Sequence, residues 1–233
     1  MIVSRPKSPR CVLLFAREPR AEAAVKGLRR SEAFFDLARN RVVRAAAALP
    51  DVDLVCVPPT AQTGGSFGER LAFAFRDASR RGYREIVVVP GDVPELTAED
   101  LAEAFRALSR SSTVLGPSPD GGVWLIGLDA REVASADFFE GVPWRTRRVF
   151  EVLLSNAPDS VVLAEMGDVD LRSDALRVRR VARAAFDLEL VAALGTLLGD
   201  PPPVLPFATE IASLPPFRLQ PASRAPPPLL PAF

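Results

Sequence analysis

The 233-residue sequence contains no histidine. This absence excludes Ser-His-Asp and Cys-His nucleophilic schemes and the usual zinc sites, because each of them depends on an imidazole. Any chemistry must therefore rest on carboxylates, lysine or arginine, hydroxyl groups and a hard metal ion.

Cysteines and long apolar runs are also scarce. Only Cys11 and Cys56 occur, each in an apolar run typical of a strand, so we expect two buried thiols, no disulfide and a reducing compartment. No apolar run approaches the roughly 18 residues of a membrane span. The apolar stretch at residues 11–16 is too short for a secretion signal, and charges follow it at once. These features predict a cytoplasmic protein with no membrane partner.

The chain carries no net charge, with 29 basic and 29 acidic residues. It therefore has no global field that would attract nucleic acid, and we predict no nucleic-acid partner. A small anionic ligand needs only a local basic cluster. The apolar content of 48% is that of an ordinary globular protein, and the length suits one domain.

Strand and helix patterns alternate along the chain. Short apolar runs predict strands at residues 11–16, 52–57, 85–90, 112–115, 123–126 and 161–164. Helical spacing predicts helices at residues 31–49, 68–81, 98–109, 146–155 and most of 176–198. This alternation predicts a three-layer α/β/α Rossmann-like sandwich with a mainly parallel sheet, in which ligands bind beyond the C-terminal ends of the strands.

The composition changes near the C-terminus. Residues 201–233 contain 11 of the 23 prolines and show no periodicity. We therefore predict one domain over residues 1–199, followed by a proline-rich C-terminal tail over residues 200–233.

Two aspartates follow predicted strands and could hold a cation. Asp92 comes directly after the third predicted strand, and Asp170 follows the sixth. One or two carboxylates, completed by substrate phosphates, are typical of a Mg²⁺ or Mn²⁺ site. Asp92 could equally form a turn before Pro94, and Asp170 could cap a helix, so the metal site stays a hypothesis.

Other loops could contact a ligand. Asp120, Gly121 and Gly122 form a tight turn that would let backbone approach a ligand, although a plain hairpin turn is the commoner reading. Trp144 could be a lid or an acceptor platform, or a half-buried structural residue. The loop at residues 63–70, with Gly65, Gly68 and Glu69, could cradle an anion at a helix start, but a glycine loop alone is weak evidence.

Basic residues stand between the first predicted strand and the first predicted helix. Lys26 lies there with Arg29 and Arg30, where a nucleotide phosphate would sit in this class of sheet. Exposed basic residues are usually solvated, so they count only in combination with the other loops.

The combination of motifs carries a family resemblance. GGSFGERLAFAF, VVVPGDVPELT, VLGPSPDGGVWLIGL, FFEGVPWRTRRV and GDVDLRSDAL occur in this order between about residues 11 and 176. The set resembles a bacterial family of glycosyltransferases that includes arsenosugar-biosynthesis enzymes, and it is similar to guanylyltransferases of the molybdenum-cofactor and phospholactate type.

The resemblance implies a nucleotide-diphosphosugar transferase (GT-A) fold. It places Asp92 and Asp170 at metal positions and matches Asp120-Gly121-Gly122 to the D-G-G of the family. The first loop departs from the family pattern: it reads FAREPRAEAAVKGLRR, without the expected glycine, with Glu22 added and with Lys26 as the remaining basic residue. Ser66 replaces an aspartate, and residues 171–174 differ as well.

The implied activity is metal-dependent transfer of a glycosyl or nucleotidyl group. The donor would be a nucleotide-sugar or a nucleoside triphosphate, the acceptor a small molecule, and the cofactor Mg²⁺ or Mn²⁺. The metal, together with Lys26 or a neighbouring arginine, would stabilise charge on the leaving phosphate, and Asp120 would act as general base. The alternative is a degenerate, non-catalytic module of the same fold that binds a nucleotide or a partner, and the altered first loop favours it.

Overall fold

The computed structural model describes residues 7–28, 31–134, 138–169, 172–185 and 187–200. Its centre is a six-stranded sheet with the order β2-β1-β3-β5-β4-β6. The strands are β1 (Arg10–Leu14), β2 (Asp53–Cys56), β3 (Glu85–Val89), β4 (Thr113–Pro117), β5 (Val123–Asp129) and β6 (Val161–Val162). β5 runs antiparallel to β3 and β4, whereas the β1–β2, β1–β3 and β4–β6 pairs are parallel. The predicted mainly parallel α/β sheet is confirmed.

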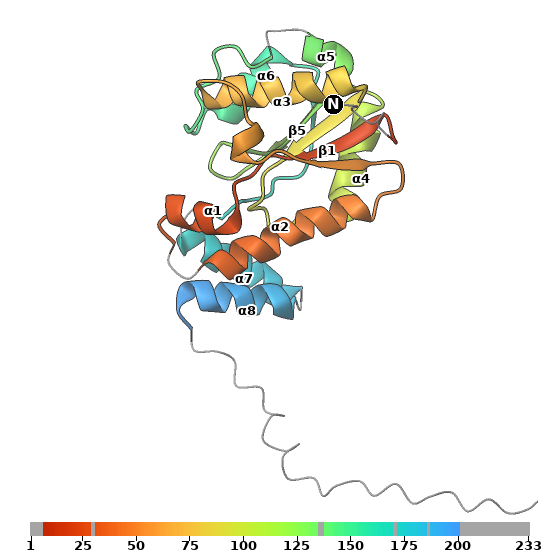
Figure 1. The fold of residues 1–233 in the computed structure, drawn as a ribbon. Coiled ribbons are helices and arrows are strands. Elements are labelled where there is room, and N and C mark those ends of the chain that lie inside the picture. Colours follow the sequence, from red (N-terminus) through yellow and green to blue (C-terminus); the bar gives the residue numbers. More distant parts are fainter. Residues whose placement is uncertain (1–6, 29–30, 135–137, 170–171, 186, 201–233) are drawn as a thin grey trace, which may run out of the picture. The chain divides into compact units, whose positions relative to one another are not determined.

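Helices cover both faces of the sheet. They are α1 (Pro19–Val25), α2 (Glu32–Ala47), α3 (Phe67–Arg81), α4 (Ala98–Leu108), α5 (Ala130–Ala134), α6 (Val149–Asn156), α7 (Arg172–Ala184) and α8 (Leu188–Leu198), with a short 3₁₀ turn at Pro59–Ala61. Because strand side chains alternate, Cys11 and Leu13 pack toward α3 and α6, while Val12 and Leu14 pack toward α2 and α4. Figure 1 shows α3, α5 and α6 on one side of the strands and α2 and α4 on the other. The predicted three layers are therefore present.

Local signals fix the starts of α3 and α4. Each begins with a capping box: Ser66 pairs with Glu69, and Thr97 pairs with Asp100, so that side chains satisfy backbone N–H groups that a helix start leaves open. Gly82 ends α3 in the left-handed conformation, as glycine allows. These boundaries agree with the sequence prediction to within one residue.

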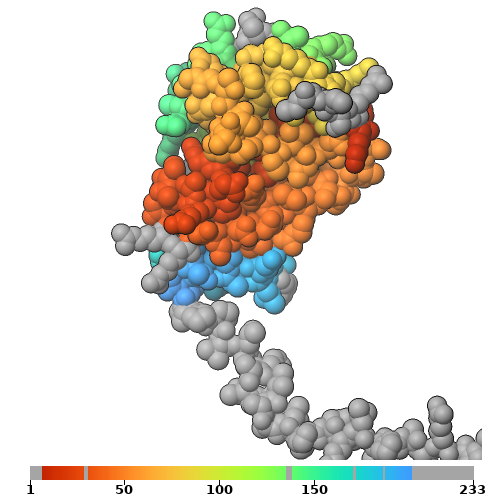
Figure 2. All heavy atoms as spheres, viewed as in Figure 1, coloured from red at the N-terminus to blue at the C-terminus, as the bar shows by residue number. Residues whose placement is uncertain are grey.

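The two C-terminal helices add a layer that the sequence did not predict. α7 and α8 pack against α2 around a third apolar cluster, which includes Phe34, Phe35, Val169 and Leu194. The space-filling view shows α8, in blue, lying against the red and orange N-terminal helices (Figure 2). The expected helical pattern at residues 176–198 is thus divided between two helices, the second capped by Asp187, which accepts a hydrogen bond from the Leu190 N–H at 3.1 Å.

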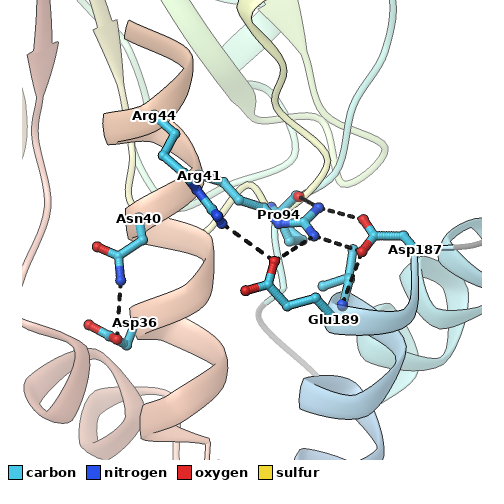
Figure 3. Close-up of polar contacts among 8 residues, drawn as sticks. Asp36, Asn40, Arg41, Arg44, Pro94, Asp187 and Glu189 are labelled. Carbon is cyan, nitrogen blue, oxygen red and sulfur yellow. Dashed lines mark hydrogen bonds and ion pairs between the residues drawn. The ribbon is translucent and has the colours of Figure 1, made fainter. Parts of the chain in front are cut away.

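Arg41 joins α2 to this C-terminal layer (Figure 3). Its Nη1 and Nη2 atoms donate to the two carboxylate oxygens of Asp187 at 2.6 and 2.8 Å, and Nη1 also donates to the Pro94 carbonyl at 3.1 Å. The hydrogen bonds from Arg41 hold the pKa of Asp187 below its ordinary value. One guanidinium therefore fixes both the start of α8 and the loop that follows β3.

Two features differ from the sequence prediction. α1 forms where a loop was expected; Pro19 stands at its N-terminus, where a proline fits, but the helix fully buries none of its residues. Cys11 is buried, and burial raises the pKa of its thiol, but Cys56 is exposed because it ends β2, the edge strand of the sheet. The prediction of a buried thiol is wrong for Cys56. Within the described ranges, no helix has the length and apolarity needed to cross a bilayer.

Candidate functional site

Two adjoining clefts open at the edge of the sheet where β1 and β3 end. Because β5 runs antiparallel, its first residue, Val123, and the turn before it reach the same edge. We call the larger the lysine cleft (about 680 Å³, with Lys26 and Asp92) and the other the tryptophan cleft (about 490 Å³, with Trp124 and Trp144). The residues common to both linings are Phe15, Arg17, Phe67, Pro90, Val123, Arg145 and Asp168. The clefts therefore meet above the strand ends, where ligands bind in this fold class.

Lys26 occupies the centre of the polar wall of the lysine cleft. Its ammonium donates to the Asp92 carboxylate and to the Val169 carbonyl at 3.0 Å, and it lies 3.7 Å from a carboxylate oxygen of Glu22. The Lys26 and Asp92 side chains are 9% and 11% exposed. The ammonium also stands 5.3 Å from the Phe35 ring centre, within range of a cation–π contact. Lys26 is one of only two lysines in the chain, the other being Lys7.

Close packing places Asp92 beside the end of β1. A side chain at Gly91 would bring its Cβ within 2.8 Å of the Ala16 Cβ, so only glycine lets the loop after β3 approach the segment after β1 this closely. Asp92 is 8% exposed overall, and its carboxylate contacts the Lys26 ammonium directly. The segments that follow β1 and β3, which are far apart in the sequence, are thereby brought into contact.

The atoms that accept hydrogen bonds from the Lys26 ammonium are oxygens of a carboxylate and a carbonyl group. Such an oxygen-only set is the type preferred by Mg²⁺ and Mn²⁺, and the ammonium marks a position that already holds a cation. The described residues contain no group of three or more acidic, cysteine or histidine side chains that could hold a metal by themselves. Asp170, the second predicted ligand, lies outside the described residues, as do Arg29 and Arg30. Asp168, two residues earlier, lines both clefts.

Glu22 brings a negative charge into the lysine cleft. Its carboxylate is 14% exposed and accepts a hydrogen bond from Arg17 at 3.1 Å. The acid added to the first loop therefore points into the cleft, where it partly neutralises Arg17 and Lys26.

The Asp120 turn borders the tryptophan cleft. Asp120 accepts a hydrogen bond from the Gly122 N–H at 2.9 Å, and both residues line the cleft. Gly121 has a φ of +86°, and an added Cβ would overlap the Arg147 carbonyl. Its own carbonyl accepts from the Phe150 N–H at 3.0 Å, so the turn is docked on the start of α6 and Gly121 lies behind the lining.

Trp144 forms a wall of the same cleft. It is half-buried, and its ring centre lies 4.9 Å from that of Phe67 and 6.0 Å from that of Phe139. A Cβ added at Gly68 would overlap the Trp144 indole, so this glycine gives room to the ring. Trp124 is buried below, where its indole N–H donates to the Ala164 carbonyl at 3.1 Å.

Of the predicted anion loop, Phe67 and Arg70 reach the clefts, but Gly65, Gly68 and Glu69 line neither of them. The Glu69 carboxylate accepts from the Gly65 N–H at 2.7 Å and the Ser66 N–H at 3.1 Å, and these hydrogen bonds, that from Ser66 foremost, lower its pKa. The backbone donors expected to cradle a ligand anion thus contact an anion of the chain itself. Gly65, Gly68 and Glu69 shape the helix start and the Trp144 packing in this structure.

The sequence prediction did not name Arg17, Arg145 and Arg147 as site residues. All three line the tryptophan cleft, and Arg17 and Arg145 also line the lysine cleft. Arg145 has a φ of +68°, which is uncommon for a residue other than glycine and is often found at functional sites. In the sequence, the three arginines that closely follow Trp144 could have indicated a basic lining at this position.

The architecture matches that of solved structures of the nucleotide-diphospho-sugar transferase type. The solved structure of a candidate nucleotide-diphospho-sugar transferase from Desulfovibrio desulfuricans G20 matches 82% of this chain and 98% of its own, at 21% identity and a TM-score of 0.67. This likeness establishes the fold.

Two further solved structures match the chain with lower TM-scores. The 4-diphosphocytidyl-2C-methyl-D-erythritol synthase of Anaerococcus prevotii DSM 20548 matches at 10% identity, over 77% of this chain and 100% of its own, with a TM-score of 0.47. A CMP:2-keto-3-deoxy-manno-octonic acid synthetase complexed with CTP matches at 11% identity, over 76% and 99%, with a TM-score of 0.45.

Sequence comparisons give a family match over part of the chain. A family described as "Uncharacterized protein conserved in bacteria (DUF2064)" matches residues 44–146, and no curated protein matches the chain. The resemblance to arsenosugar, molybdenum-cofactor and phospholactate enzymes stays a prediction.

Proposed function

We propose that the protein transfers a glycosyl group from an activated nucleotide donor to a hydroxyl of a small-molecule acceptor, with Mg²⁺ or Mn²⁺ as cofactor. The observation that carries this proposal is the oxygen cluster at the strand ends, where the Asp92 carboxylate and the Val169 carbonyl already hold a cation, the Lys26 ammonium. The cluster lies in a cleft large enough for a nucleotide and next to a second cleft for an acceptor.

The lysine cleft suits the donor. Asp92, together with Asp170, would hold the metal, which when bound neutralises charge on the donor phosphates. Lys26 would move from Asp92 to the leaving phosphate and stabilise its charge. Arg17 lines the same cleft and supplies further positive charge. Gly65, Gly68 and Glu69 would then act indirectly, by shaping the loop beside the donor.

The tryptophan cleft suits the acceptor. Asp120 would accept the proton of the acceptor hydroxyl, whose oxygen forms a bond to the anomeric carbon of the donor sugar. The bond from that carbon to the diphosphate breaks, and its electron pair leaves with the nucleoside diphosphate. Gly121 and Gly122 hold the Asp120 turn, and Trp144 flanks the acceptor.

The decisive experiment is calorimetric titration of the full-length protein with UDP, GDP, CDP and ADP, each with and without Mn²⁺. We expect one nucleotide to bind in a Mn²⁺-dependent way. Asp92→Asn should weaken this binding by about tenfold or more, because a charge-assisted contact is lost. Asp159→Asn is the matched control, since Asp159 is exposed and lies outside both clefts. Equal, Mn²⁺-dependent affinity in wild type and Asp92→Asn would remove Asp92 from the site.

The rarity of lysine provides a second readout. Reductive methylation with ¹³C-formaldehyde labels Lys7, Lys26 and the N-terminus, and Lys26→Arg assigns the Lys26 signal. Bound Mn²⁺ should broaden the Lys26 signal first, because its ammonium contacts Asp92. Equal broadening of the Lys7 and Lys26 signals would argue against a metal at this site.

The released products identify the reaction. Nucleotide-sugars that yield a nucleoside diphosphate indicate glycosyl transfer, with water as a slow acceptor. Nucleoside triphosphates that yield pyrophosphate indicate nucleotidyl transfer instead. Mn²⁺-dependent binding with neither product would support the non-catalytic binding module.

A further inference from the structure

The tryptophan cleft has an apolar base. Its buried apolar lining residues are Phe15, Leu71, Val88, Trp124, Leu125, Ile126 and Val149, and Ser118 is the buried polar residue of the lining. Gly116 makes this base possible, because a Cβ there would overlap the Trp124 indole. A base of this kind favours a ligand with a flat or aliphatic body over a fully polar sugar-like one.

One wall of the cleft is a short, well-tied segment. The four consecutive residues Trp144, Arg145, Thr146 and Arg147 all contribute to the lining. The Thr146 hydroxyl donates to the Pro143 carbonyl at 2.8 Å, and the Trp144 N–H donates to the Val142 carbonyl at 2.9 Å. The wall therefore presents an aromatic ring and two arginines from a turn that is fixed by its own hydrogen bonds.

Neither arginine of the wall has an acidic partner among the described residues, whereas Arg17 at the junction pairs with Glu22. The acids of the cleft lie elsewhere, Asp120 in the hairpin turn and Asp168 at the junction with the lysine cleft. Arg145 keeps a left-handed backbone that costs free energy in a residue with a side chain. Arg145 and Arg147 are exposed and pair with no acid in the described part of the chain, so their guanidinium groups can bind an anion whose apolar body packs on the cleft base.

We infer that the acceptor is a small organic anion: an apolar body that bears a hydroxyl group and a carboxylate or phosphate. This inference rests on the proposed function and names the acceptor class for it. The body packs on Trp144 and the cleft base, the anionic group binds Arg145 and Arg147, and the hydroxyl faces Asp120. Arg145 and Arg147 are the specificity residues.

The test uses two probes with the same hydroxymethylphenyl body, titrated into the full-length protein by ligand-observed NMR. 4-(Hydroxymethyl)benzoate carries a carboxylate, and 1,4-benzenedimethanol carries a neutral hydroxymethyl group in its place. We expect wild type to bind the carboxylate about tenfold more tightly than the diol, as expected for a charge-assisted hydrogen bond. Arg145→Met and Arg147→Met should each reduce this preference, and the double variant should abolish it. Arg110→Met is the control, because Arg110 is exposed and lies outside both clefts. Trp144→Leu should weaken both probes alike.

A second arm tests phosphate against carboxylate with 4-(hydroxymethyl)phenyl phosphate. Tighter binding of the phosphate shows which anionic group the wall prefers. Equal binding of charged and neutral probes by wild type, or binding of neither, overturns the inference. A preference that survives in the double variant overturns it as well.

The outcome is separable from that of the proposed function. Mn²⁺-dependent nucleotide binding that requires Asp92, combined with no charge preference, would refute only the acceptor class. A charge preference that requires Arg145 and Arg147, without any nucleotide binding, would leave an anion site and refute the proposed function.

Discussion

Replacing Glu22 with glutamine should tighten the binding of a nucleoside diphosphate to the lysine cleft. The change removes one negative charge and keeps the shape of the side chain. In the structure this carboxylate is mostly buried, contacts Arg17 at 3.1 Å and lies 3.7 Å from the Lys26 ammonium. The carboxylate therefore repels a phosphate. It also pairs with Arg17 and Lys26, two cations that would otherwise attract the phosphate.

Coulomb's law gives the size of the effect. A phosphate charge about 7 Å from the Glu22 carboxylate, at an effective dielectric constant of about 20, is repelled by about 2.4 kcal/mol. Salt at about 0.15 M, with a Debye length of about 8 Å, reduces this to about 1 kcal/mol, which corresponds to about fivefold in affinity. The gain should be larger at low ionic strength and smaller at high ionic strength.

The assay is calorimetry with a nucleoside diphosphate at fixed Mn²⁺ and at two salt concentrations. Glu103→Gln is the matched control, because Glu103 is exposed on α4 and belongs to neither cleft. Unchanged or weaker binding by Glu22→Gln would refute the reasoning. Glu22 would then serve to position Arg17 and Lys26, and its negative charge would not be a defect of the first loop.

Three further predictions concern stability. Arg41→Met should cost about 1–2 kcal/mol at neutral pH. The fold lowers the pKa of Asp187, so the ion pair with Arg41 stabilises the protein fully above pH 3.8, the ordinary pKa of the group. This stabilisation is lost as the pH falls through the folded pKa. Wild type and Arg41→Met should therefore converge in melting temperature at low pH. Gly121→Ala should cost more than Gly141→Ala in urea unfolding, since both have positive φ but only the first would overlap backbone, and equal costs would contradict this. Deletion of residues 201–233 should change the melting temperature by less than about 2 °C, because the described core clusters end at Leu198, and a larger fall would show that the tail adds to the core.

Much of the fold could be predicted because its signals are local. A capping box such as Thr97 with Asp100 is written within four residues, and a short apolar run such as β3 is bounded by its own neighbours. Since parallel strands place their C-terminal ends at one edge, the position of Asp92 at that edge followed from the strand pattern.

The contacts that build the site are not local. The Lys26 ammonium meets the Val169 carbonyl across 143 residues of sequence, and its contact with Asp92 spans 66. No periodicity encodes such pairs, because they depend on the packing of whole elements. The positive φ of Arg145 is equally hidden, since a left-handed conformation is unexpected for arginine.

The sequence did not predict the exposure of Cys56 or the layer formed by α7 and α8, and the reason is the same for both. An apolar run predicts a strand but does not reveal whether that strand lies at the edge of its sheet, as β2 does. The apolar face of a C-terminal helix likewise does not show which helix it will cover.

Helix α1 has a thermodynamic consequence that follows from its shallow packing. It spans seven residues, buries none of them fully and yet carries Glu22, with Lys26 at its C-terminal end. A short helix with few buried contacts opens at a small free-energy cost, so its amide hydrogens should exchange with solvent far sooner than those of α2, which buries seven residues. A ligand that contacts Lys26 would spend part of its binding free energy on closing this segment. Binding of such a ligand should then slow deuterium uptake at the amides of α1.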